Sequence, residues 1–376
     1  MSQLDSIIPL YGSPGKTIAK SSGSYVFDSD GKRYIDFESG VWASNLGHNN
    51  REINNALKKA MKETFHHGYR FKNPEASLLS AKLLNLCHLD KGQSTFLSSG
   101  SEAVNLGILI ARNISGRNKI LKINTSFLSA YGYGRLSVDN NDKVDVAFDD
   151  IRGLDELDFS DIATAVLEVG CASLEGIRFP SSDFVDTLYR LCRLNKCYLI
   201  ANEVTTGFGR TGKMFGYMHY DVKPDIVVMG KGLGNGYPVS AVLINEEVAT
   251  KFSDHPFRYA QSHQNDPSGC KVGNAVVDYF EKYNILSKSE IAGRYFKSKL
   301  EELRSEKPNK IKEVRGKGLM IAFEMSSEIE AQKLCLDLFN AGFIVGNKGA
   351  SIRLMPPLVI SNKDIDALVD EIRRVA

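Results

Sequence analysis

The chain has 376 residues, of which 43% are hydrophobic, and a formal net charge of +2 at pH 7. This length is enough for two domains, or for one large domain with a smaller attachment. Scattered, nearly balanced charges predict no nucleic-acid or membrane-surface partner, and no apolar run approaches membrane-spanning length. The N-terminus, MSQLDSIIPLYG, lacks the pattern of a signal peptide, and the six cysteines form no C-x-x-C pair. We therefore expect reduced thiols and a cytoplasmic protein.

The first part of the chain predicts a β-hairpin followed by two helices. Residues 25–27 and 33–37 flank the turn pair Asp30-Gly31. Helical patterns follow at about 50–63 and 74–87. Because the hairpin lies outside the sheet pattern that comes next, we expect it to pack on a smaller domain.

From Gln93 to about Leu243, short apolar runs alternate with amphipathic helices. The runs are STFL (94–97), KILKI (119–123), ATAVLEV (163–169), CYLIA (197–201), DIVVMG (225–230) and VSAVLI (239–244). Continuous apolar strands of this length are typical of a mostly parallel sheet that is covered on both faces. The pattern predicts an α/β fold.

The last third of the chain alternates less regularly and predicts a smaller α+β domain. It contains a long helical pattern near 268–304, the run GLMIAFEM, a helix near 328–341, the runs FIVGNKG and SIRLMPPL, and a final helix from about 362. We expect a large domain over 46–270 and a small domain made of 1–45 and 271–376.

In open α/β sheets, ligands bind at the carboxyl ends of the strands. The first run is followed by residues 98–101, Ser-Ser-Gly-Ser, which open a helix and offer backbone N–H groups to an anion; a plain helix N-cap is the alternative. Phe127 follows the second run, where a core aromatic is the alternative. Glu168 ends the third run, and a charge at the end of an apolar strand needs a partner or a role.

Lys231 is the strongest candidate for a catalytic residue, because it follows a predicted buried strand and lies in the glycine-rich loop GKGLGNGYP. Desolvation lowers the pKa of such an amine, and a neutral amine can form a Schiff base. The alternative is a structural ion pair with Glu203 or Glu168.

Nucleotide and metal sites are not predicted. Residues 207–213 fit the spacing of a P-loop, but Met214 stands where Ser or Thr must bind magnesium, and GKGLGNG lacks the acidic partner of a dinucleotide fingerprint. The seven histidines show no metal-ligand spacing. Adjacent His66 and His67 cannot share one helix face, so we expect them at the surface or at an interface.

Four stretches together resemble the class III aminotransferases, the ornithine, acetylornithine and 4-aminobutyrate group of pyridoxal 5'-phosphate (PLP) enzymes. They are GSYVFDSDGKRYIDFESG, NLGH, NEVTTGFGRTGKMFGYMHYDVKPDIVVMGKGLGNGYPVSAV and SIRLMPPLVIS, so the resemblance covers nearly the whole chain. It implies PLP fold type I, the aspartate-aminotransferase-like fold with a mostly parallel sheet in the large PLP-binding domain, and a homodimer with shared active sites. It also implies that GFGRTG is a structural loop.

The resemblance implies three catalytic residues. Lys231 matches the lysine that holds PLP as an internal aldimine and later moves the proton between Cα and C4'. Glu168 matches a glutamate near the cofactor on the substrate side, and Asn202 occupies the place of the residue that faces the pyridine nitrogen. Six further residues are implied to contact the cofactor. The phosphate cup is matched by Ser99, Gly100 and Ser101, and the aromatic residue stacked on the ring by Phe127. Val204 matches a neighbour of the ring, and Ser262 matches a residue that reaches the phosphate from the other subunit.

The substrate side is implied by Arg353, which matches the arginine that clamps the α-carboxylate with its planar fork, and by Trp42. A second substrate carboxylate has three candidate partners, each with surface placement as the alternative: Arg70, Arg135 and Arg178.

The chain departs from the family pattern at Phe127-Leu128-Ser129, Glu168-Val169, Asp266-Pro267 and Asn202. The last departure replaces an aspartate that would favour a protonated pyridine. A neutral amide predicts a largely neutral ring and slower proton abstraction. An alternative is that Asn202 replaces a natural aspartate to trap an intermediate.

The leading function is amino-group transfer between an amino acid or amine and a 2-oxo acid. One alternative is an amino-acid racemase or epimerase on the same scaffold, which returns the proton to Cα. The other is a cofactor-binding protein with regulatory work and little turnover.

Overall fold

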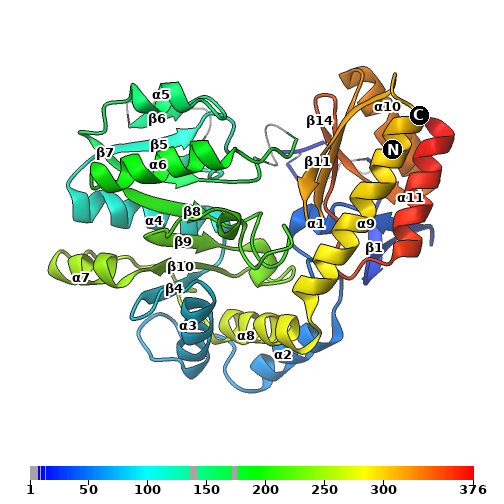
Figure 1. The fold of residues 1–376 in the computed structure, drawn as a ribbon. Helices are drawn as coiled ribbons and strands as arrows, with labels where there is room; N and C mark the ends of the chain where they lie inside the picture. Colours follow the sequence, from blue (N-terminus) through cyan, green and yellow to red (C-terminus); the bar gives the residue numbers. More distant parts are fainter. Residues whose placement is uncertain (1–6, 9, 13, 136–141, 172–175) are drawn as a thin grey trace.

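A seven-stranded sheet is the centre of the fold (Figure 1). The computed structural model describes residues 7, 8, 10–12, 14–135, 142–171 and 176–376. The strand order is β4-β10-β9-β8-β7-β5-β6. Only β10 runs antiparallel to its neighbours in this sheet, so the predicted mostly parallel sheet is confirmed. The strands are β4 (Gln93–Leu97), β5 (Lys119–Ile123), β6 (Lys143–Val146), β7 (Ile162–Leu167), β8 (Tyr198–Asn202), β9 (Ile226–Met229) and β10 (Ser240–Ile244).

Helices cover both faces of this sheet, which explains why β7, β8 and β9 are buried at every position and largely apolar. Along β9, Ile226 and Val228 pack with residues of α4, while Val227 and Met229 pack in the core on the other face. The short strand β6 was not among the predicted runs, since charged residues alternate with its two valines. The helices around the sheet are α3 (Pro74–Leu86), α4 (Gly100–Ser115), α5 (Ile151–Asp155), α6 (Ser182–Leu194) and α7 (Glu246–Asp254).

Two four-stranded sheets lie beside the large sheet and combine the two ends of the chain (Figure 1). The predicted N-terminal hairpin is confirmed, and β13 pairs with β3 in parallel, so the hairpin does pack on the C-terminal third. One sheet contains β1 (Ile18–Ser22), β2 (Tyr25–Asp28), β3 (Arg33–Asp36) and β13 (Phe343–Ile344); the other contains β11 (Ile311–Lys317), β12 (Met320–Met325), β14 (Gly346–Lys348) and β15 (Ser351–Leu354). The domain bounds at 46 and 270 stay a prediction.

The single long helix expected over 268–304 is wrong: the segment forms α8 (Pro267–Lys282) and α9 (Ile285–Glu306). Asn284 adopts a left-handed conformation, with φ of 51°, which ends one helix and starts the next. Asparagine tolerates this conformation better than most residues, so an apparently continuous pattern hides the break. The other helices are α1 (Ser39–Trp42), α2 (Arg51–Lys62), α10 (Glu328–Ala341) and α11 (Asn362–Val375). None of the helices in the described residues is long and apolar enough to cross a membrane.

Candidate active site

The carboxyl ends of the parallel strands bring the predicted residues to one edge of the large sheet. Asn202 is the last residue of β8, and Glu168 directly follows β7. Lys231 follows β9 and opens a short 3-10 turn, η3 (Lys231–Leu233). Since β4 is parallel to these strands, residues 98–101 lie at the same edge.

The N-terminus of α4 packs closely against the ends of β8 and β9. A Cβ atom on Gly100 would lie 2.6 Å from a methyl group of Val204, and one on Gly230 would lie 3.2 Å from Cα of Gly100. Only glycine permits this approach at both positions. Consequently, the start of α4 lies against both the segment after Asn202 and the residue before Lys231.

Ser99 caps this helix: its hydroxyl accepts from the N–H of Glu102 at 3.3 Å, and the Glu102 carboxylate accepts from the N–H of Ser99 at 2.9 Å. The N-cap alternative is thus confirmed for the Ser99 hydroxyl. The first intrahelical bond is donated by Ala103, so the N–H groups of Gly100 and Ser101 precede the helical ladder. These groups lie at the positive end of the helix dipole and can bind an anion.

The Lys231 side chain is held between Thr205 and Trp42. Its Nζ donates to the Thr205 hydroxyl at 2.9 Å and lies 4.5 Å from the centre of the Trp42 ring. Burial lowers the pKa of Lys231 to about 8, although Glu168 and Glu38 oppose the shift. This is the lowered pKa that the sequence predicted.

Glu203 is not the ion-pair partner of Lys231, so that alternative is wrong. The Glu203 carboxylate instead accepts from the Thr206 hydroxyl at 2.7 Å and from the N–H groups of Gly216 and Tyr217 at 2.7 and 2.8 Å. It therefore secures the turn that leads away from the sheet.

Glu168 is buried beside the loop that follows β5. One of its carboxylate oxygens accepts from the N–H of Phe127 at 2.9 Å. Burial raises the pKa of Glu168 to about 7, while Lys231 and the Phe127 N–H lower it. The Phe127 residue is 38% exposed, so the core-aromatic alternative is wrong and its ring is available for stacking.

Asn202 is 3% exposed, and its side-chain oxygen accepts from the N–H of Val204 at 3.3 Å. The oxygen end of the amide therefore faces its own backbone. The NH₂ end is the one that can donate to a group at the sheet edge.

Arg353 of β15 reaches this site from the small sheet. Its guanidinium carbon lies 5.0 Å from the centre of the Trp42 ring, so one indole contacts both Arg353 and Lys231. A guanidinium nitrogen lies 3.7 Å from the Glu38 carboxylate, which also accepts from the indole N–H of Trp42 at 3.1 Å. Trp42 and Arg353, which the sequence placed on the substrate side, are thus brought together.

Glu38 was missed by the sequence analysis. Burial raises its pKa to about 7, although Arg353 and the Trp42 N–H lower it. Its second oxygen is buried without a hydrogen-bond partner among the described residues. The local signal was weaker than for Glu168, since β3 (Arg33–Asp36) contains Arg33 and Asp36, and Phe37 separates it from Glu38.

The P-loop-like run is a series of turns that opens no helix in this part of the described chain. Arg210 within it is fully buried and donates to the carbonyl oxygen of Leu319 at 3.1 Å, to the side-chain oxygen of Asn45 at 2.8 Å and to the hydroxyl of Ser39 at 3.1 Å. Those bonds tie the segment around α1, which carries Glu38 and Trp42, to the small sheet. The run is structural, as the resemblance implied.

Ser262 is exposed in the single chain. Its neighbour Gln261 donates to the hydroxyl of Ser98 at 3.0 Å, so the segment approaches the start of α4. The three arginines considered for a second carboxylate are exposed as well: Arg70, Arg135 and Arg178.

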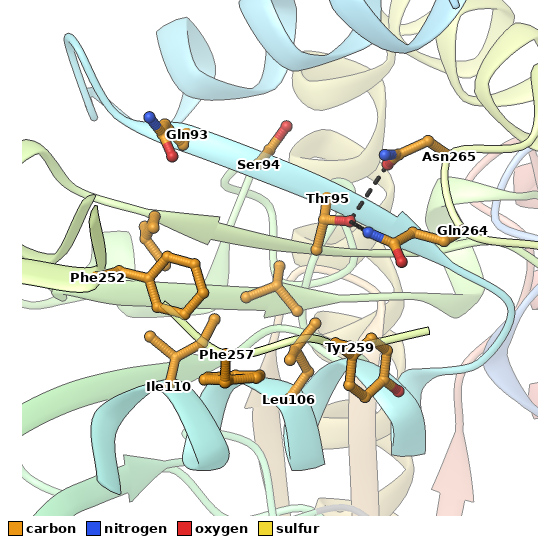
Figure 2. Close-up of a pocket in the computed structure, with 12 residues that line it drawn as sticks. Gln93, Ser94, Thr95, Leu106, Ile110, Phe252, Phe257, Tyr259, Gln264 and Asn265 are labelled. Carbon is orange, nitrogen blue, oxygen red and sulfur yellow. Dashed lines mark hydrogen bonds between the residues drawn. The ribbon is translucent and has the colours of Figure 1, made fainter. Parts of the chain in front are cut away.

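A cavity of about 280 Å³ lies elsewhere, along the edge strand β4 (Figure 2). Phe252, Phe257 and Tyr259 form its aromatic side, and Thr95 and Gln264 form a polar side joined by a hydrogen bond of 3.3 Å. None of the residues predicted for the active site lines it.

Comparison with known proteins is consistent with this site. The chain matches the family model of class III aminotransferases over residues 12–138 and 129–376. It is 32% identical to the acetylornithine aminotransferase of Aquifex aeolicus (strain VF5), with 95% of this chain and 96% of that protein covered. It is 30% identical to the [LysW]-aminoadipate semialdehyde/glutamate semialdehyde transaminase of Sulfurisphaera tokodaii, with 98% and 96% covered.

Among solved structures, the acetylornithine aminotransferase from Elizabethkingia anophelis superposes with a TM-score of 0.87 at 29% identity, covering 98% of this chain and 95% of that one. The fold is therefore PLP fold type I. The racemase alternative receives no support from these relatives.

The residues at the sheet edge also fit the cofactor. Glycine at position 100 opens an anion-binding helix end beside Val204, and the buried Lys231 amine has a lowered pKa. The NH₂ group of Asn202 and the exposed ring of Phe127 lie at the same edge of the sheet. The chain belongs to the class III aminotransferases, and it is a pyridoxal 5'-phosphate-dependent aminotransferase.

Proposed function

We propose that Lys231 is the residue that binds PLP covalently through its Nζ. Attachment needs a neutral amine. A shift of the Lys231 pKa from 10.5 to about 8 increases the neutral fraction at pH 7 roughly 300-fold, since each pKa unit is tenfold. Burial supplies the shift, and the hydrogen bond to Thr205 aims the amine.

The other residues of the sheet edge hold the cofactor non-covalently. The N–H groups of Gly100 and Ser101 bind the phosphate at the start of α4, and Phe127 stacks on the ring. The NH₂ of Asn202 donates to the ring nitrogen, because its oxygen is already bonded to Val204. When bound, PLP supplies the electron sink for carbanion chemistry at the substrate.

Once the incoming substrate amine has displaced its Nζ from the cofactor, Lys231 would serve as the base that takes the proton from substrate Cα. Its pKa near 8 suits a group that must both accept and return a proton close to neutral pH. Among the charged groups around this amine, Glu168 opposes the lowering of its pKa most strongly. Because the pKa of Glu168 is itself near 7, its protonation is coupled to that of Lys231.

Arg353 binds the carboxylate of the amino substrate, with Trp42 as the platform beneath it. Glu38 competes for the same guanidinium, because its carboxylate lies 3.7 Å away. Substrate binding at this end therefore depends on the charge of Glu38. The same end distinguishes amino acids from amines that lack a carboxylate.

For the substrates, we infer an amino donor with a carboxylate and a 2-oxo acid acceptor. The names of the relatives, acetylornithine aminotransferase and [LysW]-aminoadipate semialdehyde/glutamate semialdehyde transaminase, support donors of this class. Acetylornithine is the first donor to test.

We also infer a homodimer in which Ser262 completes the partner's cofactor site. Exposed apolar side chains gather in the segment 61–78, which favours an interface there: Met61, Phe65, Tyr69, Phe71 and Leu78. The six cysteines, all within the described residues, form no disulfide bond, which favours a reducing compartment such as the cytoplasm.

The lowered pKa of a buried lysine at the strand-end edge carries this proposal. The test is a screen of amino donors, acetylornithine included, against 2-oxoglutarate and pyruvate with purified holoenzyme. Release of the donor's carbonyl product, matched by amination of the acceptor, is the expected result. Exchange of the Cα proton without release would instead support racemisation, and neither reaction would support a low-turnover binding protein.

A further inference from the structure

Three side chains from two distant parts of the chain meet outside the active site. Nδ1 of His66 lies 2.6 Å from one oxygen of Asp266, and Nδ1 of His263 lies 2.5 Å from the other. The two imidazole rings have centroids 4.7 Å apart. Their ligand atoms all lie within 4.8 Å of one another, so one ion could contact all three groups.

Asp266 is placed for a role other than helix capping. It occupies the N-cap position of α8, yet its side chain makes no capping hydrogen bond. Both carboxylate oxygens instead face the imidazoles, although capping is the usual reason for aspartate at this position. The carboxylate is largely covered, with 11% of its side chain exposed, whereas the two histidine side chains are 42% and 57% exposed.

Two imidazoles and one carboxylate are a common ligand set for Zn²⁺ and related divalent transition metals. We propose that His66, His263 and Asp266 form a binding site for such a cation. The carboxylate offsets one of the two charges, and the side of the site that is exposed in the single chain leaves room for a further ligand such as water. Metal-to-ligand distances near 2.0–2.2 Å place neighbouring ligand atoms roughly 3.3 Å apart. The two close Nδ1–O pairs must therefore open, and ligand atoms that lie farther apart, within 4.8 Å of one another, must approach. Small rotations of the two exposed histidines achieve this.

The helix dipole of α8 opposes the cation. The opposing effect is small at an exposed helix N-terminus. Direct coordination by two imidazoles and a carboxylate outweighs it. Mg²⁺ prefers oxygen ligands, so this site with two imidazoles should not bind it, whereas a cluster made only of carboxylates would. Mg²⁺ therefore serves as the comparison cation.

The cation would cross-link two segments that are far apart in the sequence. His66 lies between α2 and α3, and His263 lies in the segment that approaches the start of α4 through Gln261. A further bond holds that segment, because the Asn265 side chain accepts from the N–H of Phe96 at 2.8 Å. A link between positions so far apart in the sequence reduces the conformational entropy of the unfolded chain and thereby stabilises the fold. It also fixes the exposed segment that carries Phe65.

Isothermal titration calorimetry with chelator-treated holoenzyme tests the site. Zn²⁺ is the probe and Mg²⁺ is the comparison cation. The variants are His66→Ala, His263→Gln and Asp266→Asn, and the control is His255→Gln, an exposed histidine of the same connecting segment. Circular dichroism of each variant reports whether the fold is retained.

We expect one Zn²⁺ per chain, no Mg²⁺ binding, at least about tenfold weaker Zn²⁺ binding in each of the three variants, and unchanged binding in the control. Zn²⁺ should also raise the Tm of the wild type and of the control but not of the variants. Failure of the wild type to bind Zn²⁺ would overturn the proposal, because the imidazoles would then only share the carboxylate through hydrogen bonds. Equal Zn²⁺ binding by wild type and folded variants would overturn it as well.

Discussion

The two ends of the active site are built differently. At the cofactor end, Lys231, Asn202 and Glu168 each lie at the end of a parallel strand of one sheet. At the substrate end, Glu38 and Arg353 come from opposite ends of the chain and meet over Trp42. The topology of a single sheet sets the first arrangement, whereas packing between the two ends of the chain sets the second.

The two ends also differ in how their charges are balanced. At the cofactor end, burial acts on an amine and a carboxyl group whose pKa values move toward each other, to about 8 and about 7. At the substrate end, a guanidinium faces the Glu38 carboxyl, whose pKa is also near 7. If the proposed roles hold, protonation near neutral pH affects chemistry at one end and binding at the other.

Replacing Lys231 should have the largest effect, because it removes both the covalent attachment and the base. We expect Lys231→Ala to lose at least about 10²-fold in kcat, since general-base catalysis alone contributes about 10²–10⁴-fold and the covalent attachment is lost as well. PLP should still bind through its phosphate but dissociate on dialysis. Lys231→Arg is the matched control: it keeps the charge but cannot supply a neutral amine. Normal turnover by either variant would show that another residue acts.

Replacing Arg353 should affect binding rather than chemistry. Loss of a charge-assisted hydrogen-bonded pair costs about 1.5–3 kcal/mol, which is roughly 10- to 150-fold. We expect Arg353→Ala to lower kcat/KM by this amount for amino acids and to leave amines without a carboxylate nearly unchanged. Arg353→Lys should recover part of the loss, because it keeps the charge without the planar fork. Equal losses for both substrate types would contradict the carboxylate role.

Sequence reasoning reached the cofactor end because the rule it used is local. An apolar run followed by a charged or polar residue is enough to mark Glu168, Asn202 and Lys231 as candidates. The rule does not mark Glu38, because the preceding residues 33–37 include Arg33 and Asp36. Its contact with Arg353 also depends on how the N-terminal hairpin pairs with the C-terminal third.

Other features could not be read from spacing along the chain. His66 and Asp266 are 200 positions apart, so no local ligand pattern marks them. The break at Asn284 was also hidden, because the apolar periodicity continues on both sides of a single left-handed residue. Such features depend on tertiary packing, which a local pattern does not contain.

Replacing Asn202 with aspartate tests how a charge at this position affects the ring nitrogen of the cofactor. A carboxylate about 4 Å from a unit positive charge contributes on the order of 4 kcal/mol at an effective dielectric of about 20, or roughly 3 pKa units. We expect Asn202→Asp to protonate the ring nitrogen and to accelerate the single-turnover half-reaction at least about tenfold. Asn202→Ala separates charge from hydrogen bonding and should not accelerate it. Ring-nitrogen NMR that shows a protonated pyridine in the unaltered protein would refute this account.

Replacing Glu38 should have the smallest effect, and that effect depends on pH. The pKa of Glu38 is about 7 in the folded chain, against 4.5 for a solvated glutamate. Below pH 7 the carboxyl group is neutral and holds Arg353 weakly, so amino acids bind well. Above pH 7 it ionises and competes with the substrate carboxylate. We expect KM for amino acids to rise about tenfold between pH 6 and 8 in the wild type, and to stay flat in Glu38→Gln.

The same substitution changes the pH dependence of stability, with a sign fixed by proton linkage. Because the folded-state pKa is above the unfolded value, the folded chain binds more protons between pH 4.5 and 7, and the contribution of Glu38 to the free energy of unfolding falls as pH rises through that window. Glu38→Gln should reduce this fall by on the order of 2–3 kcal/mol in urea unfolding, since one pKa unit is about 1.4 kcal/mol. Glu168 is left to titrate in both proteins.

Amines without a carboxylate are the control for the pH dependence of KM. Their KM should change neither with pH nor with Glu38→Gln, because they do not compete with Glu38 for Arg353. A parallel rise of KM for amines would instead place the titrating group at the cofactor end.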